Sequence, residues 1–231
     1  MTAEPLIELR EVDVAREGTD TVLVRTVNWQ LARGDFWAVG GDQGCGKTAL
    51  LATIAGLQRP AAGTVLIKGR DLTDAPEAEQ MNWRRQIGFV FEGTGRLLSH
   101  LRVADNIALP LQYHLDLSDE AAHAKVTDLL TRAGLADLAN TWPSRLSPRQ
   151  QQQISLLRAL AVPTEVVFLD NPLSGLGLSG VRWWLEFLEA LRAERPITVV
   201  ATCHDHHEWR KLPNHRAMLE AGELHVISGA N

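Results

Sequence analysis

The sequence predicts an α/β fold with a mainly parallel sheet, an N-terminal antiparallel β subdomain and an inserted helical subdomain. Short β-type runs alternate with segments of helical periodicity, which is typical of βα units. Several of these runs are apolar throughout, as the strands of a parallel sheet covered on both faces must be. We expect residues 1–231 to form one domain, with a mostly helical insertion at about 93–161.

The N-terminal part of the chain begins with two strands joined by a turn. Residues 6–14 and 21–31 flank Gly18 and Asp20, a pattern that predicts an antiparallel pair. Apolar residues at helical spacing predict a helix around residues 50–57, ended by glycine and proline. The other strands expected in this part lie at residues 36–39, 64–67 and 87–91.

The C-terminal part alternates helices and strands. Ser118 is a suitable N-cap, with Asp119 and Glu120 in the first turn, and Gly134 is expected to end this helix. The elements expected after it are a helix at 151–160, a strand at 166–169, a helix at 181–195, a strand at 197–201 and a hairpin at 217–227.

Composition excludes several classes of protein. Net charge is −5, from 23 Lys+Arg against 28 Asp+Glu, which argues against a nucleic-acid partner. Two cysteines, Cys45 and Cys203, cannot build a disulfide framework, which fits a reducing compartment. The N-terminal residues carry no signal-peptide pattern, and no apolar run approaches the ~20 residues of a membrane helix. We therefore expect a cytoplasmic protein whose membrane spans, if it serves a membrane, belong to another chain.

A glycine-rich loop between an apolar strand and a helix is the strongest motif. Residues 41–48 match G-x-x-x-x-G-K-[ST], in which glycines let the backbone wrap a polyphosphate. Lys47 is placed to reach the β and γ phosphates, and Thr48 to offer a hydroxyl to Mg²⁺. The sequence thus predicts a P-loop NTPase core. The nucleotide-binding residues expected from the loop are Gly41, Asp42, Gln43, Gly44, Cys45, Gly46, Lys47, Thr48 and Ala49.

Further polar motifs follow the loop in a fixed order. Residues 145–150 open a helix, Asp170 ends an apolar strand, residues 171–177 follow it, and His204 comes just after the next buried strand. This order resembles that of an ATP-binding cassette (ABC) ATPase over essentially the whole chain. The resemblance implies that Asp170 is the carboxylate on the Mg²⁺ side and that His204 lies near the γ-phosphate.

The same resemblance implies partners. Such subunits dimerise head to tail, so that each ATP lies between one P-loop and the signature helix of the other subunit. They drive a membrane permease that docks near residues 93–114 in this numbering. The stretch from Phe91 to His114 is similar to importer and lipid-trafficking cassettes.

The chain departs from the family pattern at several chemical positions. Asn171 stands where the family has the glutamate that polarises water, and Glu92 stands where it has a glutamine. The signature L-S-G-G-Q is replaced by residues 146–150, L-S-P-R-Q, which retains Ser147 and Gln150 and introduces Arg149. Arg16 aligns with the aromatic residue that stacks on adenine, and a guanidinium can also lie on a ring face. We expect Arg16, Ser147, Arg149 and Gln150 to contact the nucleotide.

Two hypotheses explain the departures. In one, ATP binds well but is hydrolysed slowly or not at all, because Asn171 cannot accept a proton. In the other, Glu92 and Asn171 have exchanged roles, and Arg149 reaches the γ-phosphate of the other subunit. The expected catalytic residues are His204, Glu92 and Asn171, and the expected Mg²⁺ ligands are Thr48, Asp170 and Glu92.

The leading functional hypothesis is the ATP-binding subunit of a membrane ABC transporter. It would be an ATPase with a weakened catalytic site and slow or atypical hydrolysis. We expect it to be cytoplasmic and peripheral to the membrane, working as a homo- or heterodimer with separate permease chains. The alternative is a non-hydrolysing, ATP-sensing regulatory or structural cassette. A soluble kinase or GTPase is disfavoured, since no N-K-x-D motif is present. A transition-metal site in residues 204–208 is also disfavoured, because the histidines lack ligand spacing.

Overall fold

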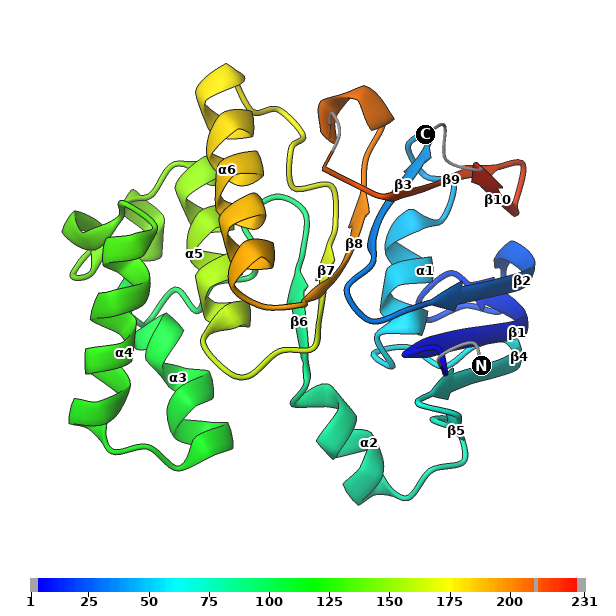
Figure 1. Cartoon of the computed structure of the whole chain (residues 1–231), viewed down its shortest axis with the longest axis horizontal. Helices are drawn as coiled ribbons and strands as arrows, with labels where there is room; N and C mark the ends of the chain where they lie inside the picture. The colour runs from blue at the N-terminus through cyan, green and yellow to red at the C-terminus, as the bar shows by residue number, and fades with distance from the viewer. Residues whose placement is uncertain (1–3, 210–211, 228–231) are drawn as a thin grey trace.

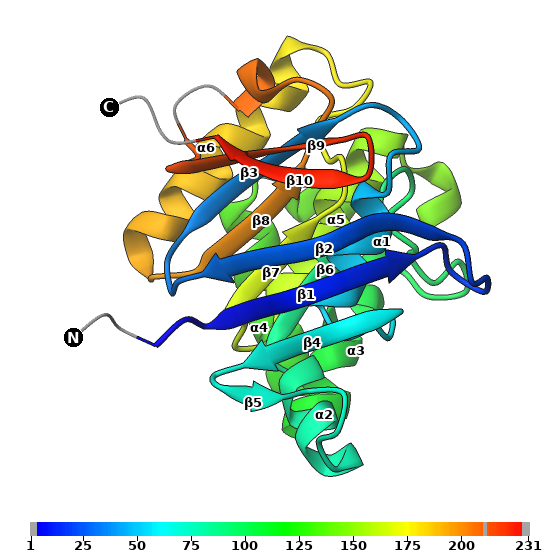
Figure 2. The same cartoon turned by 90° about the vertical axis from the view of Figure 1, so that its right-hand side faces the viewer.

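Two β-sheets enclose helix α1 (Lys47–Ile54) in the computed structural model, which describes residues 4–209 and 212–227 (Figure 1). The smaller sheet has the order β2-β1-β4-β5 and is antiparallel (Figure 2). Its strands are β1 (Ile7–Ala15), β2 (Val22–Leu31), β4 (Ala62–Ile67) and β5 (Arg70–Asp71). This sheet confirms the expected N-terminal β subdomain.

The larger sheet has the order β10-β9-β3-β8-β7-β6. Strand β3 pairs in parallel with β8 and β9, β7 pairs in parallel with β6 and β8, and only β10 is antiparallel to its neighbour. These strands are β3 (Phe36–Gly41), β6 (Ile87–Val90), β7 (Val166–Leu169), β8 (Thr198–Thr202), β9 (His215–Glu220) and β10 (Glu223–Ile227). The α/β class with a mainly parallel sheet is therefore confirmed.

The side chains of the parallel strands alternate between two hydrophobic clusters, which explains why these strands are apolar throughout. In β7, Val166 and Phe168 pack into the cluster that surrounds α1, whereas Val167 and Leu169 pack into a second cluster on the other face. Successive side chains of a strand point to opposite faces, so a sheet covered on both sides needs apolar residues at every position. Helix α6 (Leu178–Glu194) covers the second face, and its Trp184 is fully buried there.

The helical part packs on α5 (Pro148–Leu160), beside the larger sheet (Figure 1). Helices α3 (Val103–Leu115) and α4 (Asp119–Arg132) share a third hydrophobic cluster with α5. Two short 3₁₀ turns, η1 (Ala136–Leu138) and η2 (Pro143–Arg145), connect α4 to α5. These helices occupy the segment where an insertion is expected, and the domain boundaries themselves stay predictions. The Ser118 cap of α4 is present.

Four helices differ from the expectation. Helix α1 spans Lys47–Ile54 rather than about 50–57, because its first turn is formed by the polar end of the glycine-rich loop. Helix α2 (Glu77–Arg84) was not expected, because it buries only Trp83 and so shows little apolar periodicity. Helix α5 begins at Pro148 rather than at residue 151, since Ser147 and Gln150 form a capping box and proline at the first helical position needs no N–H acceptor. Helix α6 begins at Leu178, three residues earlier than residue 181.

A further short turn, η3 (His206–Trp209), follows β8. Among the described residues, none of the helices combines the length and the apolar character needed to cross a membrane.

Candidate functional site

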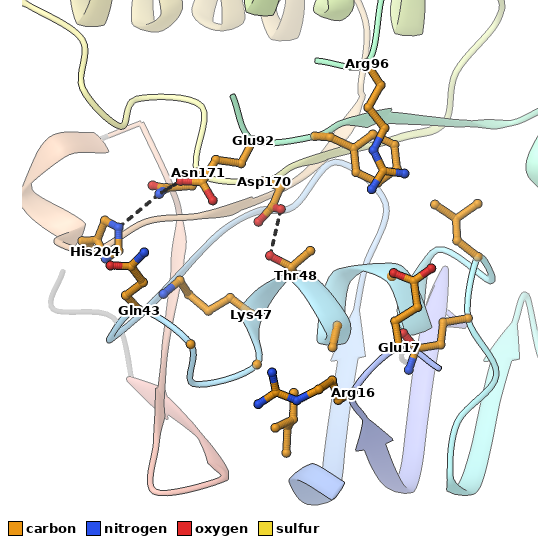
Figure 3. Close-up of a pocket in the computed structure, with 18 residues that line it drawn as sticks. Arg16, Glu17, Gln43, Lys47, Thr48, Glu92, Arg96, Asp170, Asn171 and His204 are labelled. Atoms are coloured by element: carbon orange, nitrogen blue, oxygen red, sulfur yellow. Dashed lines mark hydrogen bonds between the residues drawn. The ribbon is translucent and has the colours of Figure 1, made fainter. Parts of the chain in front are cut away.

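A cavity of about 460 Å³ lies at the carboxyl ends of β3, β7 and β8 (Figure 3). Because parallel strands end at one edge of the sheet, the loop after β3 and the residues after β7 and β8 meet there. The lining residues are Arg16, Glu17, Leu23, Gln43, Gly44, Gly46, Lys47, Thr48, Ala49, Ala52, Leu57, Gln58, Phe91, Glu92, Arg96, Asp170, Asn171 and His204. Segments far apart in the sequence thus form one site.

The glycine loop opens directly into α1. Gly46 caps this helix with φ of 110°, and a Cβ there would lie 3.0 Å from Val24, so the position requires glycine. Gly44 has φ of 82°, and a Cβ added to it would point into open space. The first N–H groups of a helix have no acceptor within that helix, and residues 46–49 line the cavity. The loop is therefore built to receive an anion.

Lys47 is held against the inside of the loop. Its buried ammonium donates hydrogen bonds to the carbonyl oxygens of Gly41 (2.6 Å) and Asp42 (2.8 Å). The Cys45 sulfur lies 3.9 Å from the same Nζ atom. Gly41, Asp42 and Cys45, which the sequence predicts to bind nucleotide, do not line the cavity. The carbonyl oxygens of Gly41 and Asp42 help to orient the lysine.

Asp170 is buried at the end of β7 and is held by two hydroxyl groups. Thr48 Oγ1 donates to Oδ2 at 2.9 Å, and Thr202 Oγ1 donates to Oδ1 at 3.0 Å. Burial raises the pKa of Asp170, Glu92 adds to the increase, and the two hydroxyls and Lys47 act against it. A buried carboxylate beside a threonine hydroxyl supplies the oxygen ligands that Mg²⁺ prefers, so the donor set fits this ion.

The raised pKa of Asp170 predicts a trade-off between stability and binding. A native state that raises a carboxyl pKa binds the proton more tightly, so the ionised group lowers stability as pH rises through that native pKa. Asp170→Asn is therefore expected to raise the melting temperature of the nucleotide-free protein at pH 7 to 8. The gain should shrink near the ordinary Asp pKa of about 3.9.

Thermal melting of both proteins at several pH values, with and without MgATP, measures this effect. A gain of 1 kcal/mol corresponds to about 2–4 °C for a domain of this size. The variant should also lose most of the stabilisation that MgATP gives to the wild type. A variant that melts lower at neutral pH and equally at acid pH would contradict the expected cost of the buried charge.

Asn171, Glu92 and His204 form a contiguous polar group at one end of the cavity (Figure 3). The Asn171 amide nitrogen lies 2.7 Å from Glu92 Oε1 and 3.1 Å from His204 Nε2. Asn171 has φ of 48°, and its backbone N–H donates to Thr202 Oγ1 at 2.9 Å. The structure thus brings together the three residues that the sequence predicts to be catalytic.

Several lining residues have no counterpart in the sequence prediction. Arg96 lies over the ring of Phe91, with 3.7 Å between its guanidinium carbon and the ring centroid. Glu17 follows the predicted Arg16, and both lie at the end of the cavity away from His204 (Figure 3). Thr202 holds Asp170 from outside the lining. Its position at the end of an apolar strand, two residues before His204, is the one signal that points to it.

The signature residues lie outside this cavity. Ser147 Oγ accepts a hydrogen bond from Gln150 N (3.3 Å) and donates to Gln150 Oε1 (2.9 Å), so both residues cap α5. Arg149 Nη1 donates to Ser179 Oγ at the start of α6 (3.0 Å). Ser147, Arg149 and Gln150 therefore do not contact a nucleotide bound in this cavity, and the only nucleotide they could contact is one bound to another subunit.

The polar segment after β8 does not gather a metal site. No group of three or more His, Cys, Asp or Glu residues is placed to hold a metal within residues 4–209 and 212–227. His206 Nε2 instead lies 2.9 Å from both Gly40 N and Ala217 O, so this ring helps to join β3 and β9.

Comparisons with known proteins agree with this geometry. The family model described as "ABC transporter" matches residues 24–174. The methionine import ATP-binding protein MetN of Lacticaseibacillus paracasei is 32% identical over 226 residues, which are 97% of this chain and 64% of that protein. MetN of Escherichia coli K12 is 34% identical over 212 residues, 91% of this chain and 61% of that protein. The chain thus spans less than two thirds of the length of these two curated relatives.

Solved structures show the same fold. A dimeric structure of the bacterial ABC transporter cassette MJ0796 has a TM-score of 0.87 and 28% identity, covering 97% of this chain and 100% of that one. A post-hydrolysis dimer of the same cassette, bound to ADP and Pi, has a TM-score of 0.86 with 28% identity and the same coverage. The family match, the relatives and the order of motifs around one cavity lead to one conclusion: this chain belongs to the ABC transporter family of ATP-binding cassettes, with a P-loop NTPase fold.

Proposed function

We propose that this chain is the ATP-binding subunit of a membrane ABC transporter and couples ATP binding and hydrolysis to a separate permease. The observation that carries the proposal is the cavity in which the glycine loop, the Thr48–Asp170 pair and His204 meet. The relatives named as methionine import ATP-binding proteins support a role in transport. The substrate of this transporter is set by chains other than this one.

Residues along the cavity have distinct proposed roles towards MgATP. Lys47 and the N–H groups of residues 44–48 bind the β and γ phosphates, and Arg16 lies against the base at the far end. Thr48 and Asp170 would hold Mg²⁺, whereas Glu92, which the sequence also predicts as a ligand, accepts a hydrogen bond from Asn171. When bound, Mg²⁺ neutralises charge on the phosphate oxygens. Lys47 needs little rearrangement, since its ammonium already lies inside the loop.

Two partners are proposed. The first is a second ABC ATPase subunit, identical or different. The N-terminus of its signature helix, which corresponds to the Ser147 end of α5 in this chain, would face this cavity. The second is a transmembrane permease at the cytoplasmic face of the membrane. A groove of about 390 Å³ beside α3 supports the second partner, because Leu109 and Tyr113 line it and are exposed, Tyr113 to 69%. Exposed apolar side chains at a groove are typical of protein interfaces.

The full chain, assembled with its permease, tests this function in a single-turnover experiment with γ-labelled ATP. We expect labelled ATP to bind in the presence of Mg²⁺ and to be converted to ADP and phosphate. If ATP binds but is never cleaved, the transporter ATPase is rejected and the non-hydrolysing, ATP-sensing cassette is favoured. Absence of binding by folded protein would reject both functions.

A further inference from the structure

We propose that Glu92 accepts the proton of the water that attacks the γ-phosphate, and that Asn171 and His204 position this carboxylate and the water. This inference rests on the proposed ATPase function and names the base of that reaction. It starts from the contact between Asn171 Nδ2 and Glu92 Oε1 at 2.7 Å. Hydrolysis needs a group with a free lone pair beside the attacking water.

The carboxylates that line the cavity differ in what holds them. Both oxygens of Asp170 accept hydroxyl hydrogen bonds, from Thr48 and Thr202. Glu17 lies at the Arg16 end of the cavity, away from the polar group around His204 (Figure 3). Glu92 lies within that group and uses Oε1 for Asn171, while its Oε2 makes no hydrogen bond to any described residue. Glu92 is therefore the carboxylate with an oxygen left for water.

The amide of Asn171 is arranged to hold water rather than to take its proton. Its Nδ2 has two hydrogens, which are directed to Glu92 Oε1 and to His204 Nε2. Its Oδ1 is buried without a hydrogen-bond partner among the described residues. A buried carbonyl oxygen without a donor is costly, and a water donating to it relieves that cost. An amide has no basic lone pair at neutral pH, so this water must lose its proton elsewhere.

His204 is not free to serve as the base in this arrangement. With Nε2 accepting from the Asn171 amide, its basic lone pair is already used. Rotation of the amide by 180° would place Oδ1 against the Glu92 carboxylate, which is electrostatically unfavourable. The backbone also fixes Asn171, since its N–H donates to Thr202 Oγ1 at 2.9 Å. His204 and Thr202 thus orient Asn171, and Asn171 orients Glu92.

The proposed step is balanced without a further reactant. The water oxygen forms a bond to the γ-phosphorus, and the bond from that phosphorus to the β–γ bridging oxygen breaks. The electron pair of the broken bond stays on ADP. The water proton moves to Glu92, which later releases it to phosphate or solvent, so ATP and water give ADP and phosphate. General-base assistance of this kind contributes typically 10²–10⁴-fold to a rate.

Four variants of the full chain, assembled with its permease, test the assignment by kcat and by ATP affinity. Glu92→Gln retains the shape of the side chain and an acceptor for Asn171, and is expected to lower kcat at least 100-fold with KM changed less than about threefold. Asn171→Glu is expected to give less than a threefold gain, because two adjacent carboxylates cannot both stay ionised. Glu92→Gln with Asn171→Glu should recover kcat to within about tenfold of the wild type. Glu189→Gln, on the exposed face of α6, is the control and should match the wild type.

Chemical rescue separates a proton acceptor from a structural residue. Glu92→Ala is expected to be inactive and to regain at least tenfold in kcat with added formate, whereas Glu92→Gln should not respond. The proposal is overturned if Glu92→Gln retains more than a tenth of wild-type kcat, or if Asn171→Glu alone raises kcat tenfold or more. Wild-type protein that binds ATP without cleaving it also overturns this step but leaves ATP binding intact. Wild-type protein that binds no ATP rejects the proposed function itself.

Discussion

Replacement of Lys47 by alanine is expected to weaken MgATP binding at least 100-fold, which corresponds to about 2.8 kcal/mol at 1.4 kcal/mol per tenfold change. The Lys47 ammonium is buried and lies within 2.6 to 2.8 Å of two loop carbonyl oxygens, so it is already desolvated and oriented. A charged donor of this kind contributes about 1.5–3 kcal/mol to each contact with an anion. Equilibrium binding of a fluorescent ATP analogue measures the loss.

Lys125→Ala provides the matched control for this experiment. Lys125 lies on the exposed side of α4, far along the chain from the glycine loop, and its removal changes net charge by the same amount. Its affinity for ATP should equal that of the wild type. If Lys47→Ala binds ATP within a few-fold of the wild type while Lys125→Ala is normal, Lys47 does not hold the phosphates.

Replacement of Trp184 by alanine is expected to lower the free energy of unfolding by about 3–5 kcal/mol. Trp184 is fully buried between α6 and the larger sheet, in the cluster that includes Leu169 and Ala201. Leu169 belongs to β7 and Ala201 to β8. Asp170 follows β7 and Thr202 ends β8, so the packing of Trp184 on these strands also supports the site. Urea unfolding followed by circular dichroism measures the change.

Leu178→Ala is the control on the same helix, because Leu178 is 87% exposed. A surface substitution of this type usually changes stability by no more than about 0.5 kcal/mol. A loss below 1 kcal/mol in Trp184→Ala would mean that α6 does not pack on the sheet through this residue.

The neighbouring Trp183 illustrates what periodicity predicts and what it leaves open. Adjacent residues on a helix point in directions about 100° apart, and of these two only Trp184 is fully buried, whereas the partly buried Trp183 contacts the edge of the same cluster. Trp183 stacks on Phe187 and donates from its indole nitrogen to Ala133 O at 2.9 Å, so it links α6 to the helical part. Helical spacing predicts that the two rings do not face one core, yet they make a T-shaped contact with centroids 5.7 Å apart. The acceptor for the Trp183 indole depends on tertiary packing.

Much of the site follows from local pattern. The glycine loop, Lys47 and the Asp170 strand end are recognisable because their spacing is fixed by the backbone geometry that phosphate binding requires. The contact from Asn171 to Glu92 joins residues 79 positions apart, and nothing local predicts its length or direction. The Phe91–Arg96 contact joins residues only five positions apart, but it depends on the conformation of the turn after β6, for which apolar periodicity gives no signal.

Apart from α2, which the sequence does not predict, the limits of the helices are predicted less well than their existence. The sequence predicts Ser147 as a nucleotide contact, which stays a prediction. Its observed role is to cap α5, which places Pro148 where a missing N–H costs little. The start of α6 at Leu178 depends on the turn after β7, for which apolar periodicity gives no signal. Caps and turns are set by single side-chain hydrogen bonds rather than by a repeating pattern.

A calorimetric titration of the full chain with ATP, in Mg²⁺ and again with Mg²⁺ chelated, tests the nucleotide site most directly. Saturable binding of one ATP per chain is expected, with clearly lower affinity after chelation because Thr48 and Asp170 then have no cation to bind. A flat titration of properly folded protein under both conditions would contradict nucleotide binding at this cavity.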